Sequence, residues 1–383
     1  VDLDNDGFLD VTDGQRAYRA DGTLLWDLRS GPDQIVGGYH GIGDFDLDGN
    51  PEIVVISSGG PHTMTLLRYD PDSPTGVEIL RRDVDINDGI STAAFCNANS
   101  EYGGGAPTVA DFDGDGVPDV GAAGAVGYIV FSGARMVDQG FSDTDLSLWF
   151  KTTRDCSSAV TGSSVFDFNG DGKAEVIYSD EWHLWMYDGE TGENLIPSTC
   201  ATNGTLWEYP LVADVDNDGQ ADIIVGSNAY SQACPDNNSR QSGIQVYGSA
   251  SGSWVRTRRV WNQHTYHITN VEEDGSIPLV EPNNWEIPGL NNFRQNVQPE
   301  GEFAAPDLVV TILPDCSNPY ALVARVRNVG QAAAPPGIPV NLYDGDPDDV
   351  NNPGMLLGPT MLTTQTLYPA DAEDLVLVLP DVS

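Results

Sequence analysis

Residues 111–119 read DFDGDGVPD, and this acidic segment decides the fold because the chain repeats it. Four other segments share its nine-position pattern, Asp-x-Asp/Asn-x-Asp-Gly-x-x-Asp/Glu. They are DLDNDGFLD at 2–10, DFDLDGNPE at 44–52, DFNGDGKAE at 167–175 and DVDNDGQAD at 214–222. Such self-similarity is the sequence signature of an architecture that uses one structural unit several times.

The repeated segment has the ligand chemistry of a calcium loop. Positions 1, 3 and 5 offer side-chain oxygens, position 7 offers a backbone carbonyl and position 9 a carboxylate, while Gly at position 6 permits the sharp turn around the ion. Hard oxygen ligands without His or Cys favour Ca²⁺. We therefore expect about five Ca²⁺ ions, with a structural role because each loop is self-contained. The expected side-chain ligands are Asp2, Asp4, Asp6, Asp10, Asp44, Asp46, Asp48, Glu52, Asp111, Asp113, Asp115, Asp119, Asp167, Asn169, Asp171, Glu175, Asp214, Asp216, Asp218 and Asp222, and the backbone ligands are Phe8, Asn50, Val117, Lys173 and Gln220.

The alternative is a set of acidic Asx-turns that hold no ion. It would leave three or four carboxylates converging in each loop with nothing to neutralise them, so the metal hypothesis is favoured. A degenerate sixth copy, NVEEDGSIP at 270–278, keeps the Asp-Gly pair but lacks the final acid. Metal binding is disfavoured in that copy.

The spacing and the flanks of the loops predict the architecture. The loops start about 40 to 70 residues apart, and periods of this order are typical of four-stranded propeller blades. Apolar strands precede most loops, as in PTVA at 107–110, and β-rich strands follow, as in IVVI at 53–56. The absence of a 3.6-residue apolar period beside the loops argues against EF-hands. We predict an all-β chain that begins with a six- or seven-bladed β-propeller.

A second, smaller domain is expected after residue 300. The Asn/Pro-rich stretch at 281–300 reads as a closing segment and linker. Short alternating strands then follow at 307–313, 321–327 and 338–343, separated by Pro, Gly and Asn turns. This pattern predicts an immunoglobulin-like β-sandwich. The domains are therefore expected at 1–300 and 301–383.

Composition excludes several classes of partner. Asp and Glu number 58 against 17 Lys and Arg, which gives a formal net charge of −41, and Lys151 and Lys173 are the only lysines. Such a surface repels phosphate backbones and anionic lipids, so we expect neither nucleic-acid binding nor membrane attachment. The longest apolar run, 375–379, is far shorter than a membrane span. A merely solubilising acidic surface is the alternative, but the acids are concentrated in the repeated loops.

Five cysteines indicate an oxidising, extracellular compartment. They lie in loop-like surroundings without CxxC or Cys/His spacing, which favours disulfides over a zinc site. Cys200 and Cys234 flank the fifth loop and its following strand, and Cys96 and Cys156 precede successive loops at similar offsets, so we expect these two pairs. The fifth, Cys316, is left without a partner in this sequence.

The loops resemble those of the FG-GAP/VCBS repeats, the calcium-bearing propeller repeats of integrin α-chain heads and large bacterial surface proteins. The resemblance covers residues 1 to about 300. Residues from Pro306 resemble the CARDB module, an immunoglobulin-like bacterial adhesion-related domain, through PDLVVTI and ARVRNVGQAAAPPGIPVNLYDGDP. CARDB modules continue beyond the point that corresponds to Ser383, so the sandwich is expected to be incomplete, and Val1 opens directly on a loop, so the chain is expected to be processed or truncated there. In secreted relatives a late cysteine often pairs with one in the first loop, which implies that Cys316 has lost such a partner.

No catalytic machinery is visible in the sequence. His264-Thr-Tyr-His267 lacks a third ligand and a zinc-protease context, and no G-x-S-x-G element occurs. We expect a secreted, calcium-stabilised structural or adhesion protein, not an enzyme, that binds another protein or copies of itself, with a head-to-tail fibre as one form. The alternative is an accessory or carbohydrate-binding propeller of a larger secreted enzyme. A glycan ligand also remains open, because eight tryptophans could bind sugar.

Overall fold

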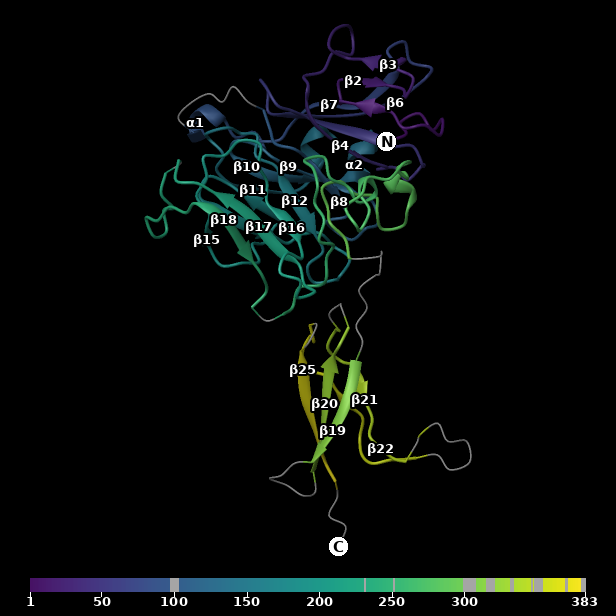
Figure 1. Cartoon of the computed structure of the whole chain (residues 1–383), viewed down its shortest axis with the longest axis vertical. Coiled ribbons are helices and arrows are strands. Elements are labelled where there is room, and N and C mark those ends of the chain that lie inside the picture. Colours follow the sequence, from purple (N-terminus) through teal and green to yellow (C-terminus); the bar gives the residue numbers. More distant parts are fainter. Residues whose placement is uncertain are drawn as a thin grey trace.

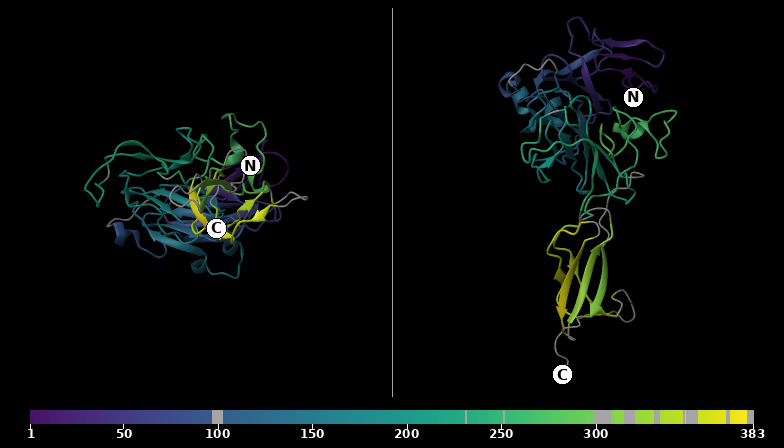
Figure 2. Two further views of the ribbon diagram at one scale, coloured as in Figure 1. Left: turned by 90° about the horizontal axis from the view of Figure 1, so that it is seen from below. Right: turned by 60° about the vertical axis from the view of Figure 1, so that its left-hand side comes forward.

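The computed structural model of the chain is built from strands and a few short helices. It describes residues 1–96, 103–230, 232–250, 252–298, 308–314, 321–330, 334–345, 347, 354–368 and 371–379. A larger body precedes residue 299 and a smaller one follows residue 307 (Figures 1 and 2). Across the described ranges, no helix is long and apolar enough to cross a membrane. The chain is all-β, as its sequence predicts, and the expected boundary at 300/301 falls outside the described residues.

Five antiparallel sheets follow one another along the larger body, and in each the strands pair in chain order. Each sheet is therefore a simple meander of three or four strands. The sheets comprise β1 (Val11–Thr12), β2 (Arg16–Tyr18) and β3 (Leu24–Asp27); β4 (Gly38–Gly43), β5 (Glu52–Ser57), β6 (Thr63–Tyr69) and β7 (Val77–Asp85); β8 (Thr108–Ala110), β9 (Asp119–Ala123), β10 (Gly127–Phe131) and β11 (Ser147–Thr152); β12 (Ser163–Phe166), β13 (Glu175–Ser179), β14 (His183–Tyr187) and β15 (Thr199–Cys200); and β16 (Leu211–Ala213), β17 (Asp222–Ser227) and β18 (Gly243–Tyr247). The helices are α1 (Thr92–Cys96), α2 (Gly133–Val137) and the 3₁₀ turns η1 (Asp143–Asp145), η2 (Ile268–Asn270) and η3 (Asn284–Glu286).

The acidic loops occupy the same place in four of these sheets. They lie between the first and second strands: between β4 and β5, β8 and β9, β12 and β13, and β16 and β17. The loop at 2–10 leads directly into β1. Each sheet is thus a copy of one loop-and-meander unit, and the first sheet begins at the strand that follows its loop.

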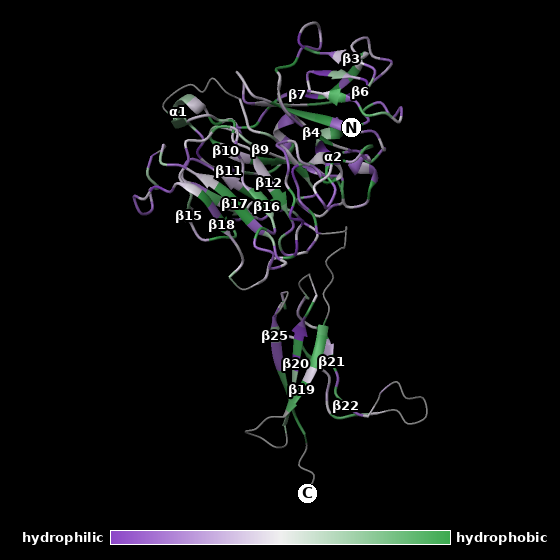
Figure 3. Ribbon diagram, in the orientation of Figure 1, coloured by the Kyte–Doolittle hydropathy of each residue, from purple (hydrophilic) through white to green (hydrophobic). Residues whose placement is uncertain are grey.

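The second strands of three sheets are buried on both faces. Every residue of β5, β9 and β13 is buried, because apolar clusters join each sheet to the next. A strand covered on both faces reads as a continuous apolar run, as EIVVIS does at 52–57, and not as an alternation. Apolar residues accordingly concentrate on the strands and polar residues on the loops (Figure 3).

The first strands of successive sheets contact one another, β4 with β8, β8 with β12 and β12 with β16. Residues 291–297 run alongside all four of these sheets. Asn291 Nδ2 donates to the carbonyl of Asp44 after β4, Phe293 forms a bridge with Val109 in β8, and Asn296 Nδ2 donates to Val212 in β16. The carbonyl of Arg294 also accepts from the N–H of Val165 in β12. A segment near residue 294 therefore ties together strands that are far apart in the sequence.

Arg294 is the centre of this segment and only 1% exposed. Its guanidinium donates to the carbonyls of His40 (3.1 Å), Pro107 (2.6 Å) and His264 (3.1 Å), and it lies 4.8 Å from the Phe293 ring. Burial lowers the pKa of Arg294 to about 10, which still leaves it charged at neutral pH. A planar fork with several N–H donors suits three carbonyls that point to one place from different elements.

The smaller body contains one three-stranded sheet faced by shorter strands. The sheet is β19 (Leu308–Pro314), β20 (Ala321–Asn328) and β25 (Ala372–Val378), and the short pairs are β21 (Pro339–Val340) with β24 (Met361–Leu362) and β22 (Tyr343–Asp344) with β23 (Met355–Leu356). β25 alternates between exposed and buried residues, as expected of a sheet with one face on a core.

Two details of the fold differ from the expectations. Residues 338–343, predicted as one strand, contribute to two short strands that pair with different partners, β24 and β23. Six or seven blades were expected, whereas the described part of the larger body shows five sheets, followed by an irregular stretch at 254–298 with two 3₁₀ turns. The blade number remains a prediction.

Replacement of Arg294 should destabilise the larger body strongly. Arg294→Met keeps the length of the side chain but leaves three carbonyls without their charged donor, at up to about 1–3 kcal/mol for each group that stays shielded from water. We expect the free energy of unfolding to fall by about 3 kcal/mol or more in urea denaturation. Arg259→Met is the control, since the Arg259 side chain is 68% exposed. A loss in Arg294→Met no larger than that of the control would contradict this role.

The pH dependence of stability should contain a contribution from His40. Desolvation of the half-buried imidazole lowers its pKa to about 4, and the nearby charge of Arg294 adds to the effect. Between pH 6.5 and 4 the unfolded chain therefore binds a proton that the folded chain does not, so stability falls as the pH falls through this window. His40→Gln should reduce the loss between pH 7 and 5 by about 2 kcal/mol. Parallel stability profiles for variant and parent would contradict the prediction.

Candidate metal-binding loops

The five loops share one hydrogen-bond pattern. In each, the position-1 Asp accepts from backbone N–H groups three to five residues later, at 2.6–3.1 Å. The position-5 Asp accepts from the N–H of position 7 at 2.8–2.9 Å. The position-9 acid reaches back to the N–H of position 2 at 2.7–3.0 Å. The backbone thus curls around its own carboxylates in the same way five times.

Left-handed backbone makes this curl possible. Gly at position 6 has φ between +85° and +90° in all five loops, as the sequence predicts. Position 4 is left-handed as well, with φ between +55° and +79°. Asn or Gly occupies position 4 in four loops and lowers the cost of that conformation, whereas Leu47 adopts it in the second loop. The sequence interpretation missed this second turn, although the Asn/Gly preference was its signal.

The carboxylates converge in the manner that a cation requires. In the loops at 2–10, 44–52, 111–119 and 214–222, one oxygen from each of positions 1, 3 and 5 lies within 4.8 Å of the others. In the loop at 167–175, Asn169 takes position 3 and its Nδ2 donates to Asp171 at 3.1 Å. Four loops therefore offer three carboxylates at the turn, whereas the loop at 167–175 offers two carboxylates and an amide.

Two buried carboxylate oxygens have no hydrogen-bond donor, and a bound cation could take the place of one. Asp10 Oδ1 and Glu52 Oε1, both at position 9, are buried and form no hydrogen bond. A buried acceptor without a donor is costly. A cation bound by positions 1, 3 and 5 could also be bound by these two oxygens, although Arg68 Nη1 lies 3.8 Å from Glu52 Oε1. In the third loop, by contrast, Asp119 already accepts from Phe112 and Gly133 through its two oxygens.

Burial makes the position-9 acids hard to ionise without a counter-charge. It raises the pKa of Glu52 to about 8 and that of Asp119 to about 7, and raises that of Glu175 well above its ordinary value. The pKa values of Asp10 and Asp222 are raised for the same reason. Neighbouring loop carboxylates raise all five further. A divalent cation would offset both effects.

Arginines partly neutralise the first two loops, which the sequence interpretation did not foresee. Arg19 Nε donates to Asp4 at 2.7 Å, and Arg68 Nη1 donates to Asp46 at 3.0 Å and lies 3.8 Å from Glu52 Oε1. Asp4 and Asp46 occupy position 3 of their loops, and Glu52 occupies position 9. One positive charge against four carboxylates still leaves each of these loops strongly negative.

The degenerate copy at 270–278 keeps only part of the arrangement. Ser276 N–H donates to Asp274 at 2.9 Å, as position 7 does to position 5 in the full loops. However, Glu273 forms an ion pair with Arg258, and position 9 is Pro278. This loop therefore lacks the convergent acids of the other five.

The cysteines pair as their positions in the sequence suggest. Disulfides join Cys96 to Cys156 and Cys200 to Cys234. Each bridge connects a segment of one sheet unit to a segment of a later one. Cys316 lies outside the described residues.

The two histidines of the 264–267 motif each have a hydrogen-bond partner. His264 contacts the carbonyl of Trp207, and His267 contacts the carboxylate of Glu281.

Comparison with known proteins points to the same repeat. The FG-GAP-like repeat family matches residues 167–225, a segment that contains the fourth and fifth loops. No curated protein matches the chain significantly. The chain is similar in fold to the biofilm matrix protein Bap1 of V. cholerae, with a TM-score of 0.56 and 18% identity over 78% of this chain and 70% of that chain. A lectin of Agrocybe aegerita that recognises non-reducing terminal N-acetylglucosamine gives a TM-score of only 0.32 at 15% identity, over 97% of this chain and 95% of that chain.

Proposed function

We propose that this chain is an extracellular structural or adhesion protein whose β-propeller is stabilised by calcium in its five loops. The observation that carries the proposal is the fivefold repetition of one loop geometry, with position-9 oxygens at Asp10 and Glu52 left without a donor. A fold similar to that of a biofilm matrix protein, an FG-GAP-like repeat and two disulfides fit such a role. No catalytic function is proposed.

The propeller consists of six units. Five are the observed sheets, and the irregular stretch at 254–298 is the sixth. Two contacts support closure of the ring: the N–H of Asp2 donates to Asn283 at 3.4 Å, and Asn291 contacts Asp44. We infer that the smaller body is an immunoglobulin-like module of the CARDB kind, because its alternating sheet packs one face against short strands.

Calcium would act on the fold through its loops. All side-chain ligands of one ion come from nine consecutive residues, and no substrate cleft is required. With dissociation constants of about 10⁻⁴ to 10⁻³ M, each ion contributes about 1 kcal/mol at millimolar calcium. Five such ions together are comparable to a large part of the stability of an ordinary domain.

Self-association is the interaction that the smaller body supports. β19 is an edge strand of its sheet within the described residues. Val310 and Ile312 lie opposite the buried Val326 and Ala324, yet they are 43% and 54% exposed. An edge strand with exposed apolar residues can pair with a further strand. A strand from another copy or from another protein would cover them through main-chain hydrogen bonds, and a contact between unlike surfaces would build head-to-tail fibres.

A carbohydrate-binding role, alone or as a module of a secreted enzyme, is the alternative. A cavity of about 520 Å³ lies beside the third and fourth loops. It is lined by Asp111, Asp167 and residues between Ile287 and Gln298. Amides from Asn291, Gln295 and other residues of that segment suit sugar hydroxyls. The single aromatic residue of the lining is Phe166, which is buried, so the cavity offers no stacking platform. We therefore favour the structural role.

The effect of Glu52→Gln should change sign with calcium. Without divalent ions, the variant removes a buried carboxylate whose Oε1 has no donor, so it should raise the melting temperature or leave it unchanged. With millimolar calcium, the variant should melt lower than the parent, because one ion loses a ligand. Calcium titration should give about five ions for the parent and one fewer for the variant.

A matched pair of substitutions separates ion binding from loss of a turn. Asp48→Asn and Asp274→Asn each remove one charge from an acid that caps the N–H two residues later. Asp48→Asn should lose one calcium ion, whereas Asp274→Asn in the degenerate loop should lose none. Equal calcium stoichiometry in all variants, or no change in melting temperature on adding EDTA, would refute the calcium proposal.

Assembly should depend on the open edge of β19. We expect light scattering of the protein with native termini to show species larger than the monomer, and Val310→Lys to abolish them because a charge then faces the incoming strand. Val280→Lys is the control, at a valine that is 69% exposed in the larger body. A monodisperse monomer at all calcium concentrations would exclude self-association.

A further inference from the structure

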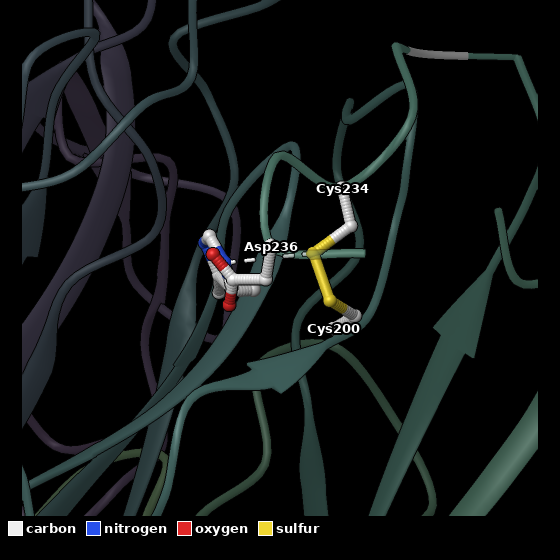
Figure 4. A group of neighbouring side chains, drawn as sticks. Cys200, Cys234 and Asp236 are labelled. Atoms are coloured by element: carbon white, nitrogen blue, oxygen red, sulfur yellow. Dashed lines mark hydrogen bonds and ion pairs between the residues drawn. A yellow bond between two sulfur atoms is a disulfide. The ribbon is translucent and has the colours of Figure 1, made fainter. Parts of the chain in front are cut away.

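Two polar side chains lie beside the Cys200–Cys234 disulfide, remote from the acidic loops. His183 Nε2 is 3.6 Å from Cys234 Sγ and 3.2 Å from Asp236 Oδ2. Figure 4 shows Asp236 next to the bridge. One donor atom from each of His183, Cys200, Cys234 and Asp236 lies within 4.8 Å of the other three. The four residues supply two sulfurs, one imidazole nitrogen and one carboxylate oxygen.

The backbone positions these side chains without help from the disulfide. His183 in β14 and Cys200 in β15 are directly opposite each other in an antiparallel pair, which places their side chains on the same face. Cys234 and Asp236 belong to a tight turn in which Cys234 N–H donates to the Ser239 carbonyl at 2.9 Å and the Cys234 carbonyl accepts from Asn238 N–H at 2.9 Å. The site therefore consists of one strand pair and one hydrogen-bonded turn.

Hydrogen bonds also hold the turn against the strand pair. Gln241 N–H donates to Thr202 Oγ1 at 2.8 Å, Thr202 N–H donates to Gln241 Oε1 at 3.3 Å, and Ser198 Oγ donates to Asp236. These contacts flank Cys200 and Cys234 in the chain. They would keep the two cysteines close together after the bridge opens.

The observed separations match a tetrahedral zinc site. With Zn–N and Zn–O bonds of about 2.0–2.1 Å and Zn–S bonds of about 2.3 Å, the N–S edge of the tetrahedron is about 3.6 Å and the N–O edge about 3.4 Å. The corresponding distances here are 3.6 Å and 3.2 Å. The other donor pairs lie within 4.8 Å of one another, and the two sulfurs must separate to about 3.8 Å. The Asp236 side chain is 44% exposed, so the site opens to solvent on that side.

The donor set also distinguishes this site from the acidic loops. Thiolate and imidazole donors favour zinc and similar borderline-soft cations, whereas oxygen-only loops favour calcium. The second disulfide, Cys96–Cys156, has no comparable neighbours among the described residues, since it belongs to none of the clusters that could hold a metal. The combination of His, Asp and two Cys is therefore particular to one bridge.

We propose that His183, Cys200, Cys234 and Asp236 form a thiol-dependent zinc site, which is closed when Cys200 and Cys234 are joined and opens when they are reduced. A dithiol reductant transfers two electrons and two protons to the bridge, giving two thiols and the oxidised reductant. Zn²⁺ then displaces the two thiol protons and binds both thiolates, His183 Nε2 and one Asp236 oxygen. Zinc and the disulfide exclude each other, so zinc would protect the reduced chain from oxidation until the metal is removed.

The test uses the full chain with Cys316→Ser, so that the fifth cysteine contributes no thiol, and with excess calcium to keep the acidic loops supplied. The protein is reduced, freed of reductant without oxygen, and titrated with Zn²⁺ against a chromophoric chelator. The reduced protein should bind one zinc ion more than the oxidised protein, with a dissociation constant of about 10⁻⁷ M or tighter. Co²⁺ in place of Zn²⁺ should give thiolate charge-transfer absorption.

Variants identify the ligands. His183→Ala and Asp236→Asn should each weaken zinc binding to the reduced protein about tenfold or more, and Cys200→Ser with Cys234→Ser should abolish it. Cys96→Ser with Cys156→Ser is the matched control and should leave the extra zinc in place. Equal zinc binding in oxidised and reduced protein would overturn the proposal. So would binding that is insensitive to His183 and Asp236, which is the result expected if reduction unfolds the site. Calcium stoichiometry is measured separately, so failure of the calcium loops would not imitate either result.

Discussion

The carbonyls that meet at Arg294 impose the main constraint on the larger body. First strands from four different sheets come together, and their backbone groups need partners that no strand of their own sheet supplies. Residues 291–297 supply them through side-chain N–H groups that donate to backbone carbonyls. Asn291 donates to Asp44, Arg294 to His40 and Pro107, and Asn296 to Val212. A single late segment thus satisfies groups from most of the preceding 250 residues or so of the sequence. This segment therefore adds polar contacts to the apolar clusters that join successive sheets.

The acidic loops inherit their position from these first strands. Asp44 follows β4, Asp111 follows β8 and Asp214 follows β16 without an intervening residue, so each position-1 carboxylate begins where a first strand ends. Asn291 bonds both the N–H and the carbonyl of Asp44, which couples the second loop directly to the 291–297 segment. The concentration of negative charge at the strand ends is therefore a consequence of the repeat.

Local features of this architecture could be predicted from the sequence, and among the long-range ones only the two disulfides were. The nine-residue pattern fixes the curl of each loop, and a run such as EIVVIS identifies a strand buried on both faces, because both depend on neighbouring residues. Nothing near Arg294 indicates that its partners would be His40 and Pro107, which lie about 200 residues or more away in the sequence. The arginines at Asp4 and Asp46 were missed for the same reason. Residues 254–298 have no regular hydrophobic period in the sequence, since side-chain contacts and not a strand ladder hold them in place. The clustering of His183 and Asp236 around one disulfide was also missed, because it depends on strand register.

Three kinds of cross-link act over three distances in the chain. Four of the acidic loops stabilise the turn between the first two strands of their own sheet, and the loop at 2–10 precedes β1. Each disulfide spans further, with separations of 60 residues for Cys96–Cys156 and 34 for Cys200–Cys234, and joins one sheet unit to a later one. The 291–297 segment connects the first strands of four sheets, β4, β8, β12 and β16. Loss of an ion from one of the proposed calcium loops should therefore loosen one turn, loss of a bridge one junction between units, and loss of Arg294 the contacts among four sheets. This order follows from loop-closure entropy, because a contact that closes a longer stretch of chain orders more of the molecule when it forms.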